Sequence, residues 1–360
     1  MSTVKATNFQ NASSATANMV TDASGNVSFG GTAAMSSSFL RNRIINGDMR
    51  IDQRNAGAEV NPAVSGTYYL DRWIATSTVA SKFKIGQNAG AVTPPTGYTS
   101  YLGLTSLSAY TVGAAESYAV RQLIEGLNVS DLAWGTASAA TVTLSFWVRS
   151  SLTGTFGGSL RNNDGSRSYP YSYTISVANT WEQKTVTIAG DTSGTWLTTN
   201  GTGIILTFSI GTGSTLSGTA GAWAAANYLS ATGATSVVGT SGATFYVTGV
   251  QFEVGTVATP FERQIYNAQL AQCQRYFQLM DMGYVYGYAT ASAQISSNYT
   301  FPVAMRTTAT IAVVTNPTFG SGTAVSSYQA TSRITAFYMI STGGPFATWT
   351  GGQFSAAAEL

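Results

Sequence analysis

One segment of the sequence gathers the residue types that can hold a sugar. Residues 160–173 read Leu-Arg-Asn-Asn-Asp-Gly-Ser-Arg-Ser-Tyr-Pro-Tyr-Ser-Tyr. Amides, guanidinium groups and carboxylates hydrogen-bond sugar hydroxyls, and an aromatic ring packs against sugar C–H groups. The candidate carbohydrate-binding residues are therefore Arg161, Asn162, Asn163, Asp164, Arg167, Tyr169 and Tyr171. The run 162–165 is equally typical of an ordinary hairpin turn, so both interpretations stay open.

The sequence contains few residues that could catalyse a reaction. The chain has no histidine, which excludes a Ser-His-Asp triad, and its single cysteine, Cys273, has no histidine to activate it. Hydrolysis would then need two carboxylates about 5–9.5 Å apart, as in glycoside hydrolases. The 15 acidic residues are scattered, and the nominal pairs are Glu116 with Glu125 and Asp164 with Asp191. We expect no catalytic residues, no cofactor and no enzyme activity.

The overall composition excludes several further classes of protein. One cysteine cannot form an intrachain disulfide or a thiolate cluster, and we expect no metal site. The chain carries 17 basic and 15 acidic residues, so its charge of +2 gives no broad attraction for nucleic acid. No apolar run approaches the ~20 residues that span a bilayer. We expect no nucleic-acid partner and no membrane insertion, and 12% aromatic residues argue against disorder.

Short apolar segments that alternate with Gly, Ser and Thr turns indicate an all-β protein. In residues 141–148, Val142, Leu144, Phe146 and Val148 share one face, which is the period-two pattern of a half-buried antiparallel strand. Similar strands are expected at 171–177, 182–188, 203–210 and 244–253. Two packed sheets, most simply a jelly-roll β-sandwich, are therefore expected over residues 40–263.

Three further regions surround this sandwich. Residues 1–39 carry only two charges, Lys5 and Asp22, and are predicted to be an extended arm with a hairpin over 20–29. Such a segment cannot build a core, so it is either a flexible arm or one that orders on a partner. Residues 264–281 are expected to form a connecting helix, and residues 282–360 a small β domain.

The predicted helix carries a regular apolar spacing. Tyr266, Leu270, Cys273, Phe277 and Met280 step by 4, 3, 4 and 3 residues, which is the seam of a helix that packs along its length. This seam either covers the chain's own sandwich or forms an oligomer interface. We predict the interface, and with it a homotrimer.

Two aromatic motifs have competing interpretations. Tyr69-Leu-Asp-Arg-Trp73 predicts a corner with Trp73 in the core, or alternatively a tryptophan that stacks on a sugar. Tyr284, Tyr286 and Tyr288 form a one-sided row in the last domain. That row fits packing against a neighbouring subunit or the helix better than ligand contact.

Four separated segments carry a family resemblance. They are Arg41–Arg54 with its Asn-Gly-Asp, Tyr69–Trp73, Phe245–Gly255 followed by Thr259–Arg263, and Gln272–Phe277. In this order they resemble phage virion proteins of the tail-fibre type, whose jelly-roll module is similar to carbohydrate-binding modules. Residues 301–360 look like the small terminal β domain of such fibres. Some of those modules hold calcium beside the closing strand, but this chain has Thr248-Gly249 where acids are often found.

The resemblance implies a non-enzymatic virion fibre protein that binds host cell-surface glycan for adsorption. Its implied partners are other virion proteins through the N-terminal arm, further copies of itself and a host surface polysaccharide, and its location is the exterior of the particle after assembly in the host cytoplasm. The alternatives are a capsid-attached head fibre or decoration protein, and a depolymerase tailspike. Any sugar is expected on loops rather than strands, with Tyr169 and Tyr171 exposed.

Overall fold

The structure is a computed structural model that describes residues 8–9, 19–21, 27–28, 41–63, 66–281, 283–320, 326–328, 330–342 and 344–360. The chain forms two units, residues 1–41 and residues 42–360. In the first unit, antiparallel strands pair in the order β1-β2-β3, with bounds β1 (Asn8–Phe9), β2 (Met19–Thr21) and β3 (Val27–Ser28). The β2–β3 pair agrees with the hairpin expected over 20–29, whose turn at 24–26 lies outside the described residues.

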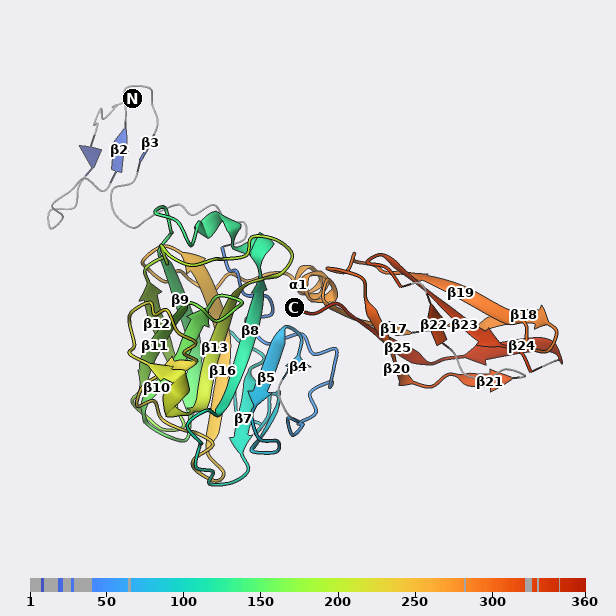
Figure 1. Ribbon diagram of the computed structural model, residues 1–360, viewed down its shortest axis with the longest axis horizontal. Coiled ribbons are helices and arrows are strands. Elements are labelled where there is room, and N and C mark those ends of the chain that lie inside the picture. Colours follow the sequence, from blue (N-terminus) through green and yellow to red (C-terminus); the bar gives the residue numbers. More distant parts are fainter. Residues whose placement is uncertain are drawn as a thin grey trace, which may run out of the picture. The chain divides into compact units, whose positions relative to one another are not determined.

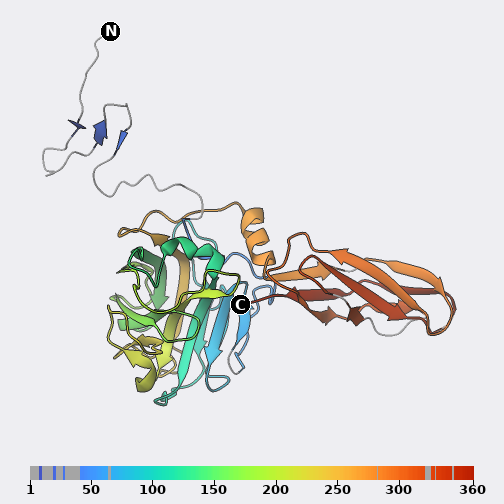
Figure 2. The same cartoon turned by 45° about the horizontal axis from the view of Figure 1, so that its top comes forward.

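Two antiparallel sheets pack face to face in the second unit (Figures 1 and 2). The six-stranded sheet has the order β11-β10-β13-β8-β5-β4. Its strands are β4 (Thr67–Leu70), β5 (Trp73–Ser77), β8 (Ser117–Glu125), β10 (Gly154–Arg161), β11 (Ser168–Ile175) and β13 (Thr202–Thr212). The five-stranded sheet has the order β12-β9-β16-β7-β6. Its strands are β6 (Phe83–Gln87), β7 (Leu102–Ser106), β9 (Val142–Ser150), β12 (Glu182–Ile188) and β16 (Thr244–Val254).

Short elements lie in the connections of the sandwich. They are the 3-10 turns η1 (Gly126–Asn128), η2 (Ser130–Leu132) and η3 (Ser214–Leu216), and the parallel pair β14 (Ser217–Gly218) and β15 (Ser230–Ala231). The expected all-β sandwich is thus confirmed, and each strand predicted between 141 and 253 is present. Among the described residues, none of the helices has the length and apolar character to cross a membrane.

Alternation along the strands builds the core between the two sheets. Val142, Leu144, Phe146 and Val148 are all fully buried, as their common face predicts. Trp73 is fully buried as well, and its indole Nε1 donates to the carbonyl of Asn46 at 3.0 Å. The corner interpretation of the Tyr69–Trp73 motif is therefore confirmed.

The motif segment at residues 41–54 lies against the closing strand β16. Asn42 donates from Nδ2 to the Val250 carbonyl at 3.0 Å, and its Oδ1 accepts from the Phe252 amide at 3.0 Å. A side chain at Gly47 would meet the Val250 carbonyl oxygen at 2.2 Å, so this position needs glycine. Asp48 pairs with Arg50, and the motif therefore holds the end of the sandwich together.

The predicted helix over 264–281 is wrong in its second half. The helix α1 runs over Tyr266–Gln274, and Phe277–Asp281 forms strand β17, which pairs with β25 (Gln353–Ala357). Tertiary pairing with a strand 76 residues away outweighs the local helix preference of this Gln- and Ala-rich segment.

The continuous helical seam proposed as an oligomer interface therefore does not exist. Cys273, Phe277 and Met280 are buried within their own chain, Leu270 is half-buried, and Tyr266 is 51% exposed. The homotrimer stays a prediction, but this seam no longer supports it.

The C-terminal region consists of three-stranded antiparallel sheets with a core of their own. Their orders are β17-β25-β20, β18-β24-β21 and β19-β23-β22. The strands are β18 (Val285–Ala289), β19 (Gln294–Thr300), β20 (Thr310–Thr315), β21 (Thr318–Gly320), β22 (Ser326–Tyr328), β23 (Ile334–Ile340) and β24 (Gly344–Thr350). Met280, Phe301, Phe337 and Phe354 are among the residues of that core. Tyr284 and Tyr286 are exposed, and the side chain of Tyr288 lies outside the described residues.

Residues 358–360 connect the last strand back to the sandwich. Glu359 forms ion pairs with Arg54 and with the fully buried Arg72. The guanidinium of Arg72 lies 3.6 Å from the ring centroid of Tyr276, and Arg306 donates to the carbonyl of Ala358 at 2.9 Å. Glu359 is therefore the acid that neutralises two arginines at this junction.

Candidate functional site

The predicted sugar loop is a self-satisfied hairpin turn between β10 and β11. Asn162 is fully buried, donates to Ser166 Oγ at 2.9 Å and accepts from the Arg167 amide at 3.0 Å. Asp164 accepts from the amide and the hydroxyl of Ser166 at 2.9 and 2.8 Å. These bonds lie inside the turn, so they support its shape and offer nothing to a ligand.

The two arginines of this loop also have partners. Arg167 makes a bidentate ion pair with Asp191, with both nitrogen–oxygen distances 2.7 Å, and Arg161 donates to the side-chain oxygen of Asn227. Asn163 and Asp164 are the exposed members of the predicted set, and a sugar contact by them stays a prediction.

The expectation that Tyr169 and Tyr171 are exposed is wrong. They are 8% and 1% exposed, because both lie on the core-facing side of β11. The hydroxyl of Tyr171 donates to the carbonyl of Thr207 at 2.7 Å, and burial raises its pKa. Both rings belong to the core and cannot pack on a sugar at the surface.

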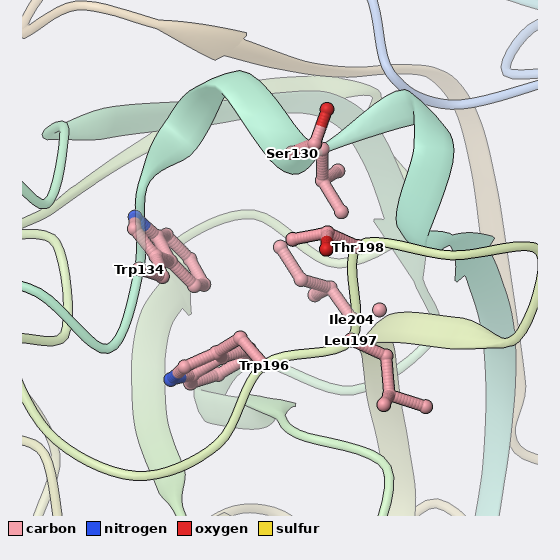
Figure 3. A pocket seen from close by; sticks show the side chains of 8 residues that line it. Ser130, Trp134, Trp196, Leu197, Thr198 and Ile204 are labelled. Atoms are coloured by element: carbon pink, nitrogen blue, oxygen red, sulfur yellow. The ribbon is translucent and has the colours of Figure 1, made fainter.

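A cluster of three tryptophans packs at the core of the sandwich. Trp134, Trp196 and Trp223 make edge-to-face contacts with centroid distances of 4.8 to 5.4 Å. Trp134 and Trp196 line a slot together with Leu197, Thr198 and Ile204 (Figure 3). The slot measures about 10 Å³, which is the space of a single water molecule. A pyranose ring does not fit, so this cluster is packing rather than a ligand site.

The outward face of the five-stranded sheet has a different character. Trp147 lies on the side of β9 opposite the core residues, directly between Gln183 on β12 and Thr248 on β16. Trp147 is half-buried and Gln183 is exposed. A half-buried tryptophan beside an exposed amide on a sheet surface provides an apolar ring and hydrogen-bonding groups at one place.

Further aromatic rings form two groups, one of them beside Arg149, which follows Trp147 by two residues on β9 and is directly opposite Tyr246. In one group, Tyr101 contacts Trp181 edge to face at 5.6 Å and Tyr246 at 5.3 Å. In the other, Tyr98 contacts Phe261 at 5.5 Å. Tyr98, Trp181 and Phe261 are half-buried. We call the set Tyr98, Trp147, Trp181, Gln183 and Phe261 the aromatic surface.

Two arginines border the aromatic surface. The guanidinium of Arg263 lies 4.9 Å from the ring centroid of Tyr98, and that of Arg149 lies 5.4 Å from the centroid of Tyr246. Burial raises the pKa of Tyr98, while the charge of Arg263 opposes this shift. The tyrosine hydroxyl therefore stays protonated at neutral pH and can donate as well as accept a hydrogen bond.

The nominal carboxylate pairs are not arranged for hydrolysis. Glu116 and Glu125 lie at opposite ends of β8, about 30 Å apart at the rise of an extended strand. Asp191 is fully buried and held by Arg167, whereas Asp164 is exposed in the turn.

The electrostatic surroundings of the β8 acids also differ from those of an acid catalyst. A hydrogen bond from the Gly113 amide lowers the pKa of Glu116. Burial alone would raise the pKa of Glu125, but hydrogen bonds from Arg275 and Tyr276 lower it overall. Across the described ranges, no three His, Cys, Asp or Glu side chains are grouped to hold a metal ion.

The aromatic surface was missed from the sequence, although a signal for it exists. Thr141, Thr143, Ser145 and Trp147 alternate with the core residues of the same strand, so Trp147 is the one large apolar side chain on a polar face. Trp181, Tyr98 and Phe261 lie in connections whose course over the sheet no periodicity reveals. The prediction that a sugar would contact loops rather than strands stays a prediction.

Comparisons with known proteins find similarity at the level of structure. No family model matches the chain, and no curated protein matches it. The tailspike protein 4 enzymatically active domain of bacteriophage CBA120 aligns with a TM-score of 0.31 and 12% identity, over 61% of this chain and 22% of that chain. This chain thus spans about a fifth of the tailspike chain.

Two sugar-related structures give comparable values. The family 11 carbohydrate-binding module of the Clostridium thermocellum cellulase Lic26A-Cel5E aligns with a TM-score of 0.26 and 12% identity, over 56% of this chain and 99% of that chain. An arabinose-bound α-L-arabinofuranosidase, MgGH51, aligns with a TM-score of 0.32 and 12% identity, over 62% of this chain and 32% of that chain. All three TM-scores are below 0.5.

Proposed function

We propose that this protein binds carbohydrate through the aromatic surface. The observation that carries the proposal is Trp147, half-buried on the outward face of the five-stranded sheet, with the exposed Gln183 beside it. An indole on the solvent side of a strand contributes no core packing on that side. Its ring suits the C–H face of a pyranose, and the amide suits the ring hydroxyls.

The carboxylates of this sheet favour binding over hydrolysis. Glu253 is fully buried and accepts from the Thr259 amide and hydroxyl at 2.9 and 2.6 Å. Glu182 accepts from the amides of Ser176 and Val177 at 2.9 and 2.8 Å. Both acids are already engaged by the protein, which supports a module that holds glycan without cleaving it.

The biological setting of this binding belongs to the same proposal. The four segments that resemble phage virion proteins support a fibre protein on the particle exterior, where several copies would adsorb to host polysaccharide. Weak sites suffice in such an assembly because effective concentration converts them into avidity. A capsid-attached head fibre is the alternative, and locating the chain on an imaged particle decides between tail and head. Release of reducing ends from host polysaccharide would favour a depolymerase instead.

The binding is tested by matched tryptophan variants. Trp181 and Trp223 are both half-buried, and each donates its indole N–H to a backbone carbonyl, at 2.8 Å to Thr93 and 2.7 Å to Ala189. The wild-type protein is screened on a glycan array, and the affinity for the best ligand is then measured by calorimetry. Trp147→Ala and Trp181→Ala should weaken binding about tenfold or more, which corresponds to about 1.4 kcal/mol, and Trp223→Ala should not.

Two results would contradict the proposal. One is a glycan array without any bound sugar at protein concentrations that reveal weak binders. The other is an equal loss of affinity in all three variants, which would indicate a general effect on the fold. Melting temperatures of the variants separate that case from a local loss of contact.

A further inference from the structure

The outward face of the six-stranded sheet carries a row of polar side chains. Ser159 on β10 is directly opposite Thr207 on β13, and Thr207 is directly opposite Arg121 on β8. Directly opposed residues have their Cβ atoms about 5 Å apart, so these three side chains are neighbours on one face. Arg161 follows two residues after Ser159 on the same strand and points to the same side, about 7 Å along.

The segment that contains β15 covers part of this row. A side chain at Gly157, the preceding outward position of β10, would meet Ser230 Oγ at 2.6 Å. The hydroxyl of Ser230 therefore lies over β10 next to Ser159. Ser159, Thr207 and Ser230 are all buried, with relative exposures of 0 to 1%.

Several of these buried polar groups have no hydrogen-bond partner among the described residues. The hydroxyls of Ser159, Thr207 and Ser230 make no hydrogen bond within the described chain. Buried hydroxyls are normally paired, since leaving one unpaired costs free energy. Arg121 has neither a hydrogen bond nor an ion pair among the described residues, and the Nε atoms of Arg121 and Arg161 are buried and unpartnered.

The charges at this place are unbalanced. The ion pairs formed elsewhere in the described chain include neither Arg121 nor Arg161. The one hydrogen-bond partner of Arg161 is the neutral side chain of Asn227. Burial lowers the pKa of Arg121 to about 9, and the nearby charge of Arg161 adds to the shift. Burial also lowers the pKa of Arg161, to about 10. Among the described residues, the fold thus holds two like charges close together without an acid paired to either.

We infer that Arg121, Arg161, Ser159, Thr207 and Ser230 form a binding site for an oxyanion, here called the two-arginine site. Guanidinium groups and hydroxyls are donors for carboxylate, sulfate and phosphate oxygens, and an anion would offset both positive charges at once. Arg121 is half-buried and is the most exposed of these five residues.

The source of the anion follows from the proposed function, on which this part of the inference rests. If the protein binds glycan, the ligand is the acidic group of a uronate-containing or sulfated glycan. The two-arginine site is on the opposite sheet from the aromatic surface, so it is a second, separate contact for an acidic polysaccharide. A free inorganic oxyanion is the other source of the same chemistry.

The test uses the full chain with three probes at matched ionic strength: inorganic sulfate, an oligogalacturonate, and a neutral galactan oligosaccharide of equal length. Sulfate should raise the melting temperature by about 2 °C or more over chloride. The oligogalacturonate should bind at least tenfold more tightly than the neutral oligosaccharide. Arg121→Gln should remove both effects, whereas Arg333→Gln, which removes an exposed arginine of the C-terminal sheets, should retain them.

The outcomes separate this inference from the proposed function. Sulfate stabilisation that depends on Arg121, without oligogalacturonate binding, supports the oxyanion site with a free anion and rejects an acidic glycan. Binding of the neutral sugar that needs Trp147 but is unchanged in Arg121→Gln supports the aromatic surface and overturns the two-arginine site. No stabilisation by sulfate and no preference for the acidic sugar also overturns it.

Discussion

The clearest test of the core assignment is the removal of the Tyr171 side chain. Tyr171 is 1% exposed, stacks with Tyr173 at a centroid distance of 6.3 Å and donates its hydroxyl to the Thr207 carbonyl. Truncation of a buried aromatic ring to alanine costs about 3–5 kcal/mol, and loss of the hydroxyl alone costs about 1–2 kcal/mol. Tyr171→Ala should therefore be much less stable than Tyr171→Phe.

The expected shifts are large enough for a routine thermal melt. At about 2–4 °C per kcal/mol for a domain of this size, Tyr171→Ala should lower the melting temperature by roughly 6–20 °C, and Tyr171→Phe by roughly 2–8 °C. Ser172 is exposed on the same strand, so Ser172→Ala is the matched control and should stay within about 0.5 kcal/mol of wild type. The assay is differential scanning fluorimetry, with calorimetry to confirm the unfolding enthalpy.

A specific result would refute the reasoning about Tyr171. If Tyr171→Ala melted within about 2 °C of the wild type, the ring would not be part of the core. If it also lost glycan binding while it stayed folded, the loop would be the sugar site after all. Binding per folded molecule should instead be unchanged in Tyr171→Phe.

Three further predictions concern other parts of the chain. Burial raises the pKa of Asp71 to about 6 in the folded protein, so the folded state binds the proton of this carboxyl more tightly than the unfolded chain does. The stability that the bound proton contributes is therefore lost as pH rises from about 4 through 6. Asp71→Asn should become more stable relative to wild type by about 2 kcal/mol between pH 4 and pH 7 in denaturant titrations, and a pH-independent difference would contradict this. Glu359→Gln leaves the buried Arg72 without its anionic partner and should cost about 3–5 kcal/mol, whereas an unchanged urea midpoint would show that the ion pair is dispensable. A chain that starts at residue 40 should fold normally but fail to enter particles, and incorporation of this truncation would reject the anchoring role of residues 1–39.

The sandwich could be predicted from the sequence because its strands obey a simple rule. The period-two pattern in Val142–Val148 depends on the sheet alone, so it locates both the strand and its buried face. The period-two pattern of the same strand also indicates the aromatic surface, because the polar face of that strand carries Trp147.

What could not be predicted depends on distant partners. Phe277–Asp281 has helix-compatible residues, and only its pairing with Gln353–Ala357 makes it a strand. Residue types favour the sugar loop as a binding site, but they do not reveal that Asp191 neutralises Arg167 or that Tyr171 faces the core. Arg121 and Arg161 are 40 residues apart in sequence and meet only through the order β10-β13-β8.

The position of β25 has a consequence for the time course of biosynthesis. β25 is the central strand of the β17-β25-β20 sheet, although it is the last of the three to leave the ribosome. β17 and β20 therefore lack their common partner strand until residues 353–357 have been synthesised. Arg72 likewise lacks its ion-pair partner until Glu359 has been synthesised. Domains generally fold in the order of their synthesis, so the sandwich can be complete while this sheet is still open. Premature termination before residue 353 would release a folded sandwich with two unpaired strands, a species that quality-control proteases and aggregation would remove.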